Sequence, residues 1–180
     1  MPEIFNEAMK AKDMALIRSR GIILEVWKEW KEQFGRGYNP IMPYKTEDAR
    51  VVILTMGSMD ETAEAAIDEM RKRNMPVGLL RLKLWRPFPV EELKEAVKGV
   101  KVLAVMDRAV SFGGPAGPVC AEVKSALYEE RERPVIVNYI IGLGGRDVTV
   151  EDFMRMAEGA TRAEKEKPKE AYEIYGVRGS

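Results

Sequence analysis

The segment from Asp107 to Pro118 gathers the side chains and glycines best suited to ligand binding in this sequence. Arg108, Ser111 and Phe112 follow the end of an apolar run, and glycines and prolines then alternate. Backbone N–H groups of such a loop can approach an anion at the N-terminus of the next helix. The segment has no lysine and no Gly-x-Gly spacing, and its prolines lack N–H groups. It therefore favours a rigid turn over a phosphate cradle, which stays the alternative.

Two further loops carry residues that could contact a ligand or a neighbouring domain. Trp85 and Arg86 lie beside two prolines and Phe88, a cluster that suits an interface; alternatively, the aromatic rings cap the core. Arg146 follows two glycines, which predicts a turn that presents its guanidinium to a neighbour. Within the Asp107–Pro118 loop we expect Phe112 to pack against another domain or subunit.

The full set of candidate interface or ligand-loop residues follows from these loops. They are Ser58, Arg86, Arg108, Ser111, Phe112, Gly113, Gly114 and Arg146. Ser58 with Glu61 also forms a capping-box pattern. The neighbours Asp107 and Arg108 have two interpretations. Either Arg108 binds a ligand or a neighbouring domain, or the two side chains form a local ion pair.

The residue types exclude several kinds of catalysis. The 180 residues include one cysteine, Cys120, and no histidine. Disulfides within the chain, cysteine-ligated iron–sulfur clusters, His-based zinc sites and nucleophiles paired with histidine are therefore excluded. We expect no catalytic residue and no bound metal in this segment. Cys120 lies among valines, which predicts a buried and inert thiol.

Charge and composition narrow the class of protein. Lys+Arg and Asp+Glu both number 29, which gives no electrostatic reason to expect a nucleic-acid partner. Apolar runs are too short to span a bilayer and the N-terminus lacks a signal-peptide core, so we expect a cytoplasmic protein without a membrane partner. One glutamine and four asparagines favour a thermophilic source.

The elements that must position these loops alternate along the chain. Apolar runs near 50–56, 76–85, 101–106 and 133–142 predict strands that are buried on both faces. Helices are expected over 60–74, 90–98 and 116–130 and from Thr149, which forms a capping pattern with Asp152. Residues 41–45 predict an edge strand because Pro43 cannot lie in a central one. The order predicts a mostly parallel sheet with helices on both faces.

The N-terminal 37 residues are expected to form a helical arm or connector. Apolar residues recur with a helical period from 3 to 34, either as one helix or as two joined at Gly21. Trp27 and Trp30 are expected to bury against the body or a partner. The domains expected are a connector over 1–37, an α/β domain over 38–160 and a charged tail over 161–180.

Four stretches in this order resemble the alpha subunit of pyruvate:ferredoxin oxidoreductase (pyruvate synthase). They are "VVILTMGSMDETAEAAIDEMR", "VGLLRLKLWRPFP", "VLAVMDRAVSFGGPAGPVCAEVKSALY" and "YIIGLGGRDVTVEDF". The resemblance covers about residues 36–160 and implies core domain II, which is similar to the C-terminal domain of transketolase. That fold is a three-layer α/β/α sandwich with a five-stranded, mostly parallel sheet and one antiparallel edge strand.

The resemblance also implies what the whole enzyme does. Such an enzyme converts a 2-oxo acid, with pyruvate favoured here, together with coenzyme A and oxidised ferredoxin, to acyl-CoA, CO₂ and reduced ferredoxin. Thiamine diphosphate with Mg, and the iron–sulfur clusters, are expected on other domains or subunits. The implied partners are beta-, gamma- and delta-type subunits and the pyrimidine-binding domain of the alpha subunit.

The sequence departs from a complete alpha subunit in ways that bear on activity. These 180 residues include no pyrimidine-binding domain, no diphosphate motif and no cysteine cluster, and we expect either one domain of a longer alpha subunit or a split subunit. We therefore expect the chain alone to be inactive and to organise the interface around a thiamine diphosphate site carried elsewhere. The alternative is a stand-alone flavodoxin-like module that binds a nucleotide or coenzyme A at the carboxyl-end loops.

Overall fold

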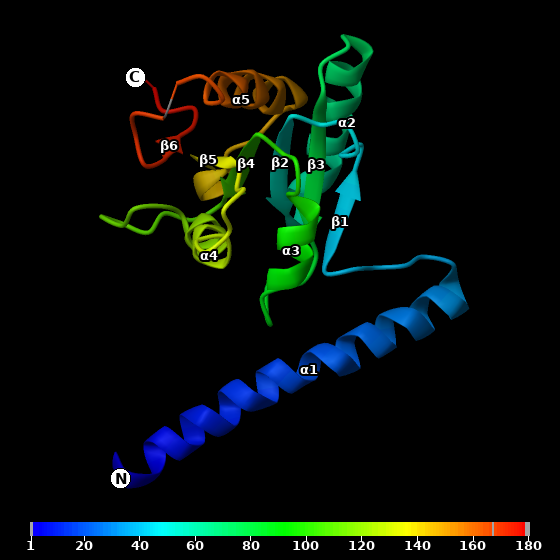
Figure 1. The fold of residues 1–180 in the computed structure, drawn as a ribbon, viewed down its shortest axis with the longest axis vertical. Helices are drawn as coiled ribbons and strands as arrows, with labels where there is room; N and C mark the ends of the chain where they lie inside the picture. The colour runs from blue at the N-terminus through cyan, green and yellow to red at the C-terminus, as the bar shows by residue number, and fades with distance from the viewer. Residues whose placement is uncertain (1, 167, 179–180) are drawn as a thin grey trace.

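The computed structural model describes residues 2–166 and 168–178. It contains a three-layer α/β body and one long helix that projects from it (Figure 1). The strands in chain order are β1 (Ile41–Tyr44), β2 (Val51–Met56), β3 (Val77–Leu82), β4 (Val102–Asp107), β5 (Val135–Ile140) and β6 (Glu173–Ile174). The helices are α1 (Phe5–Phe34), α2 (Asp60–Lys72), α3 (Val90–Ala96), α4 (Pro118–Ala126) and α5 (Val150–Arg162). Short 3-10 turns span Pro2–Ile4, Gly57–Met59 and Leu143–Gly145.

The strands form one sheet in the order β1-β3-β2-β4-β5-β6. Strands β2 to β6 are parallel, whereas β1 is antiparallel to β3, with Pro43 opposite Leu80. The predicted edge strand is confirmed, because Pro43 lies on the outermost strand. The N–H that proline lacks there interrupts no hydrogen bonds between inner strands of the sheet. The sheet has six strands rather than the expected five, since the two-residue β6 adds to the edge of β5.

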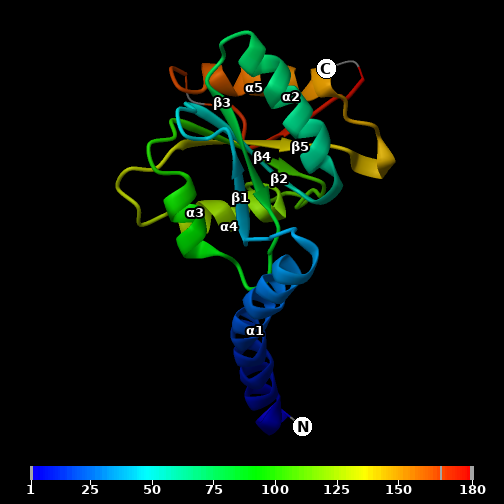
Figure 2. The ribbon, with the colours of Figure 1, turned by 90° about the vertical axis from the view of Figure 1, so that its right-hand side faces the viewer.

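Two hydrophobic cores fill the space between the sheet and its helices. One core packs α2 and α5 on one face, and includes the fully buried Ile67 and Phe153. The second packs α3 and α4 on the other face, and includes Leu93 and Val123. Figure 2 shows the two helix pairs on opposite sides of the sheet. Strands covered on both faces explain why β2, β3 and β4 read as continuous apolar runs.

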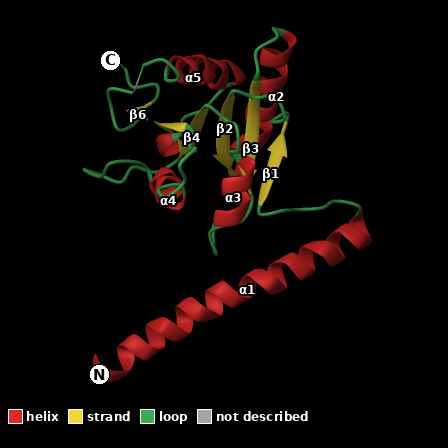
Figure 3. Cartoon of the chain, viewed as in Figure 1, coloured by secondary structure: helices red, strands yellow, loops and turns green. Residues whose placement is uncertain are grey.

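The long N-terminal helix is a single element without a break. The structure shows no interruption at Gly21, and none of the described side chains of α1 is buried. The helix ends at Gly35, whose φ of 71° is left-handed and whose N–H donates to the carbonyl of Lys31 over 2.9 Å. An ion pair between Arg20 and Glu92 links α1 to α3. The secondary-structure view shows how far the helix extends beyond the body (Figure 3).

The tryptophans of α1 are not buried within the chain. Trp30 stays 39% exposed, and the half-buried Trp27 ring lies 6.0 Å from that of Tyr38. Burial of these tryptophans against the body is therefore wrong, and burial against a partner stays a prediction. No helix among the described residues combines the length and the apolar composition needed to cross a membrane.

Several predicted helix ends differ from those observed. Helix α4 ends at Ala126 rather than near residue 130, and Pro89 is the N-cap of α3 rather than a first-turn residue. The capping box of Thr149 and Asp152 at α5 is confirmed, with both hydrogen bonds present. The expected domain boundaries after residues 37 and 160 stay a prediction, although α5 continues to Arg162.

Candidate functional site

The candidate site lies at the carboxyl ends of the parallel strands, where the loops after β2, β3, β4 and β5 meet. In sheets of this kind the ligand-binding and interface residues gather at this edge. The loops after β2, β4 and β5 converge on Gly142. A Cβ built there would lie 2.6 Å from the methyl group of Met59 and 3.4 Å from Nε of Arg108. These loops carry most of the residues singled out from the sequence.

A buried carboxylate fixes the loop after β4. Asp107 is 1% exposed and accepts hydrogen bonds from the backbone N–H groups of Val119 and Cys120, over 2.8 and 3.1 Å. The side-chain amide of Asn138 donates to the same carboxylate over 3.0 Å. Burial raises the pKa of Asp107, and these three donors act against that rise. The expected local ion pair between Asp107 and Arg108 is therefore wrong, because the carboxylate points into the core instead.

The same network holds the start of α4 against the sheet. The N–H group of Gly117 donates to Oδ1 of Asn138 over 2.7 Å. A Cβ at residue 117 would lie 2.4 Å from the Asp107 carboxyl group, so only glycine fits. The carboxylate occupies the N-terminus of α4, where a phosphate would have to bind. The structure thus disfavours a phosphate site at this helix.

The outer part of this loop presents an aromatic ring to solvent. Phe112 is 93% exposed, the highest exposed fraction among the large apolar side chains that the structure describes as exposed. The turn beneath it is ordered: Gly113 has a left-handed φ of 72°, and the N–H of Gly114 donates to the carbonyl of Ser111 over 2.8 Å. Ser111 is half-buried. A rigid turn that holds an exposed ring is the arrangement expected of an interface anchor.

The aromatic rings of the loop after β3 cap the core, which is one of the two alternatives considered for this cluster. Trp85 and Phe88 pack against the core under α3 and α4. The guanidinium of Arg86 lies 4.8 Å from the Trp85 ring and forms an ion pair with Glu122 of α4. Nε1 of Trp85 donates to the same carboxylate over 3.1 Å. Arg86 is therefore engaged within the chain, and its role at an interface stays a prediction.

Ser58 and Arg146 take positions that the sequence did not reveal. Ser58 lies in the 3-10 turn before α2, where Met59 is the N-cap and has no side-chain capping bond, so the predicted capping box is wrong.

Arg146 donates to the carbonyl of Gly176, which attaches the loop after β5 to the C-terminal segment. The ring of Tyr175 in that segment lies 6.5 Å from the ring of Tyr139 in β5.

Two structural groups at this edge were missed in the sequence. Asn138 is one of them, because its partners Asp107 and Gly117 are far away along the chain. The other is an ion pair with one buried partner: Asp60 is 4% exposed, pairs with Lys83, whose side chain is 28% exposed, and accepts from the hydroxyl of Thr55 over 2.7 Å. Thr55, Asp60 and Lys83 have no recognisable spacing, so only the fold brings them together.

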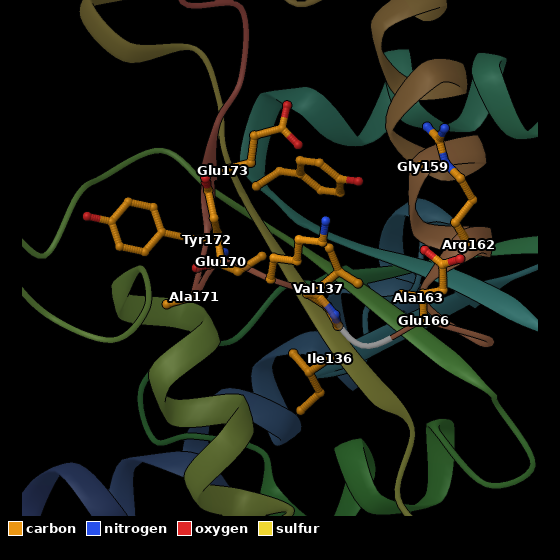
Figure 4. A pocket seen from close by; sticks show the side chains of 14 residues that line it. Ile136, Val137, Gly159, Arg162, Ala163, Glu166, Glu170, Ala171, Tyr172 and Glu173 are labelled. Carbon is orange, nitrogen blue, oxygen red and sulfur yellow. The ribbon is translucent and has the colours of Figure 1, made fainter. Parts of the chain in front are cut away.

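A separate hollow of about 370 Å³ lies beside β5, between α5 and the C-terminal segment (Figure 4). Its walls include Val137 of β5, Arg162 of α5 and Tyr172 and Glu173 of the tail. None of the residues singled out from the sequence lines it. Within residues 2–166 and 168–178, no group of three His, Cys, Asp or Glu residues could hold a metal ion.

The thiol of Cys120 is expected to be inert in the folded chain. Cys120 is fully buried, and burial raises the pKa of its thiol to about 12. Because the thiolate is the reactive form, the folded chain should hold roughly a thousandfold less of it at pH 8.5 than the unfolded chain. Alkylation by iodoacetamide, followed by mass spectrometry, should be slow in buffer and fast in guanidinium chloride. Equal rates in both solvents would contradict the buried environment.

The comparisons with known proteins agree with the fold and the loops. The model of the family described as "Pyruvate:ferredoxin oxidoreductase core domain II" matches residues 49–153. The chain belongs to this core domain II family. The match includes β2 to β5 and every carboxyl-end loop described above.

Relatives of this core domain II are subunits of 2-oxo-acid oxidoreductases. The pyruvate synthase subunit PorA of Thermotoga maritima is 40% identical over 88% of this chain and 40% of its own length. PorA of Pyrococcus furiosus is 41% identical over 84% of this chain and 38% of its own length. The ketoisovalerate oxidoreductase subunit VorA of Pyrococcus horikoshii is 43% identical over 78% of this chain and 36% of its own length. The chain thus spans about two fifths of the length of these relatives.

Solved structures show the same fold for core domain II. A "Split gene transketolase, inactive beta4 tetramer" aligns with a TM-score of 0.54 and 18% identity, over 73% of this chain and 46% of that chain. A 2-oxoglutarate:ferredoxin oxidoreductase from Magnetococcus marinus aligns with a TM-score of 0.51 and 18% identity, over 73% of this chain and 21% of that chain. The predicted transketolase C-terminal-like architecture is confirmed.

Proposed function

We propose that this chain is the core domain II of the alpha subunit of a 2-oxo-acid:ferredoxin oxidoreductase, with pyruvate as the favoured substrate. The identity of 40% to a pyruvate synthase subunit, over 88% of the chain, carries this proposal. The whole enzyme would form acyl-CoA, CO₂ and reduced ferredoxin. Its thiamine diphosphate, Mg and iron–sulfur clusters would be held by other domains or subunits.

The role proposed for this domain is to organise an interface, not to catalyse. The carboxyl-end loops present Phe112 to solvent on a turn that the buried Asp107 and Asn138 hold in place. We propose that this surface packs against the pyrimidine-binding domain of the alpha subunit or against another subunit. The long α1, with no described residue buried, would connect to the preceding domain.

The stand-alone nucleotide-binding alternative has less support from the geometry. Its motivation was the glycine-rich start of α4, and Asp107 fills that position. A thermal-shift screen with nucleotides, coenzyme A and thiamine diphosphate tests it directly. We expect no stabilisation of the isolated chain by any of the three, and a saturable shift with one of them would favour the alternative.

A further inference from the structure

The hollow beside β5 is lined by polar groups that have no partner in the described parts of the chain. We propose that it binds a free α-amino acid with an apolar side chain. The carboxylate of the amino acid would accept from Arg162 and from the hydroxyl of Tyr139, and its ammonium group would face Glu173. None of the carboxyl-end loops described above lines this hollow. The inference rests on the fold alone and does not require the proposed function.

A buried tyrosine brings an unpaired hydroxyl to the hollow. Tyr139 of β5 is 5% exposed and is one of the residues that line the hollow. Its ring packs edge-on against the ring of Tyr175, but within residues 2–166 and 168–178 its hydroxyl has no hydrogen-bond partner. Buried tyrosine hydroxyls usually have such a partner, because an unpaired polar group in the interior costs free energy. The hydroxyl is therefore available to a ligand that enters the hollow.

The hydroxyl of Tyr139 and a guanidinium group converge on the bare backbone of Gly159. A Cβ built at residue 159 would lie 2.8 Å from the hydroxyl oxygen of Tyr139 and 3.8 Å from Nη2 of Arg162. Arg162 forms none of the ion pairs found among the residues that the structure describes. Glycine thus leaves open the space beside two hydrogen-bond donors. A carboxylate is the acceptor that suits a guanidinium, since charge-assisted bonds of this kind are the strong ones.

An unpaired carboxylate lies across the hollow from this guanidinium. Figure 4 shows Arg162 on α5 and Glu173 on the C-terminal segment at opposite sides of the hollow. Both residues are exposed, and Glu173 also belongs to none of the ion pairs in the described ranges. Burial raises the pKa of Glu173 and repulsion from Glu170 adds to the rise, whereas Arg162 opposes it. An ammonium group beside Glu173 would give this carboxylate the partner that it lacks.

The size and the charge of the hollow suit a zwitterion. Its volume of about 370 Å³ lies near the lower end of the range for small-molecule sites. Two basic and three acidic residues line it: Arg162, Lys169, Glu166, Glu170 and Glu173. A simple anion would therefore meet more negative than positive charge, whereas a ligand with both charges can pair with each wall. Val137 of β5 and Ala163 of α5 also line the hollow and offer apolar surface to the side chain of an amino acid.

Titration by ¹H–¹⁵N NMR of the 180-residue chain tests the site. L-Leucine is the probe, and 4-methylpentanoate and 3-methylbutylamine carry its carboxylate and its amine separately. We expect the amide signals of Tyr139, Gly159 and Glu173 to shift together and to saturate with L-leucine. Each of the other two compounds should bind at least about tenfold more weakly, because it lacks one charge-assisted contact. The proposal is overturned if L-leucine gives no saturable shift, or if either of the two compounds binds as tightly.

Two variants and one control separate this site from unspecific binding. Tyr139→Phe removes only the hydroxyl and should weaken the binding of L-leucine about fivefold. Arg162→Gln should weaken it about tenfold, because it removes the charged donor. Arg131→Gln, which changes an exposed arginine between α4 and β5 outside the hollow, should leave the binding unchanged. Thermal unfolding checks that each variant is folded, and unchanged affinity of either folded Tyr139→Phe or folded Arg162→Gln would overturn the proposal.

Discussion

Replacement of Asp107 by alanine is expected to lower the free energy of unfolding by about 3 kcal/mol. The change would leave three buried N–H groups without an acceptor: those of Val119 and Cys120 and one N–H of the Asn138 side-chain amide, whose nitrogen also donates to the carbonyl of Val105. Each buried donor left unpaired costs about 1–3 kcal/mol, and partial relaxation of the loop reduces the sum. Urea unfolding followed by circular dichroism measures the loss.

A matched control separates this network from a general effect of charge. Asp147 is exposed and its carboxylate accepts only the N–H of the next residue, so Asp147→Ala should cost less than about 1 kcal/mol. Asp107→Asn keeps the size of the side chain but places an amide N–H against backbone donors. Its loss of unfolding free energy should therefore lie between the losses for Asp107→Ala and Asp147→Ala. Equal stability of Asp107→Ala and Asp147→Ala would contradict the role assigned to the buried carboxylate.

Replacement of Phe112 by aspartate is expected to weaken assembly with the partner subunits by roughly thirtyfold or more, without a loss of stability. A ring that is 93% exposed contributes almost nothing to the folded chain. Buried aromatic anchors at interfaces commonly contribute at least about 2 kcal/mol, which corresponds to that factor. The aspartate adds the cost of burying a charge.

The control for Phe112 is a second exposed aromatic residue. Tyr128 lies 74% exposed after α4, at the opposite end of the sheet from Phe112, and Tyr128→Asp should assemble normally. Affinity is measured by surface plasmon resonance against the co-purified remaining subunits, and stability by thermal unfolding. Unchanged affinity of Phe112→Asp would remove the loop after β4 from the proposed interface.

The sequence predicted the sheet well because its signals are local. Continuous apolar runs identify β2, β3 and β4, and Pro43 identifies the edge strand. The capping pattern of Thr149 and Asp152 was predictive because an extended residue leads directly into α5. The same pattern failed at Ser58, because a 3-10 turn that begins at the left-handed Gly57 comes directly before α2.

The rest of the candidate site depends on contacts between distant parts of the chain. Asp107 and Asn138 meet only because β4 and β5 are neighbours in the sheet, so sequence spacing could not link them. Strand β6 was missed because two residues in a charged tail carry no strand pattern.

Reconstitution tests the central claim most directly. The purified chain is assayed for pyruvate-dependent reduction of benzyl viologen with thiamine diphosphate, Mg and coenzyme A. It is then assayed after co-expression with the pyrimidine-binding region and the beta, gamma and delta subunits from the same source. We predict no turnover by the chain alone, and co-purification with activity when the other subunits are present. Turnover by the isolated chain, or no association with those subunits, would contradict the assignment.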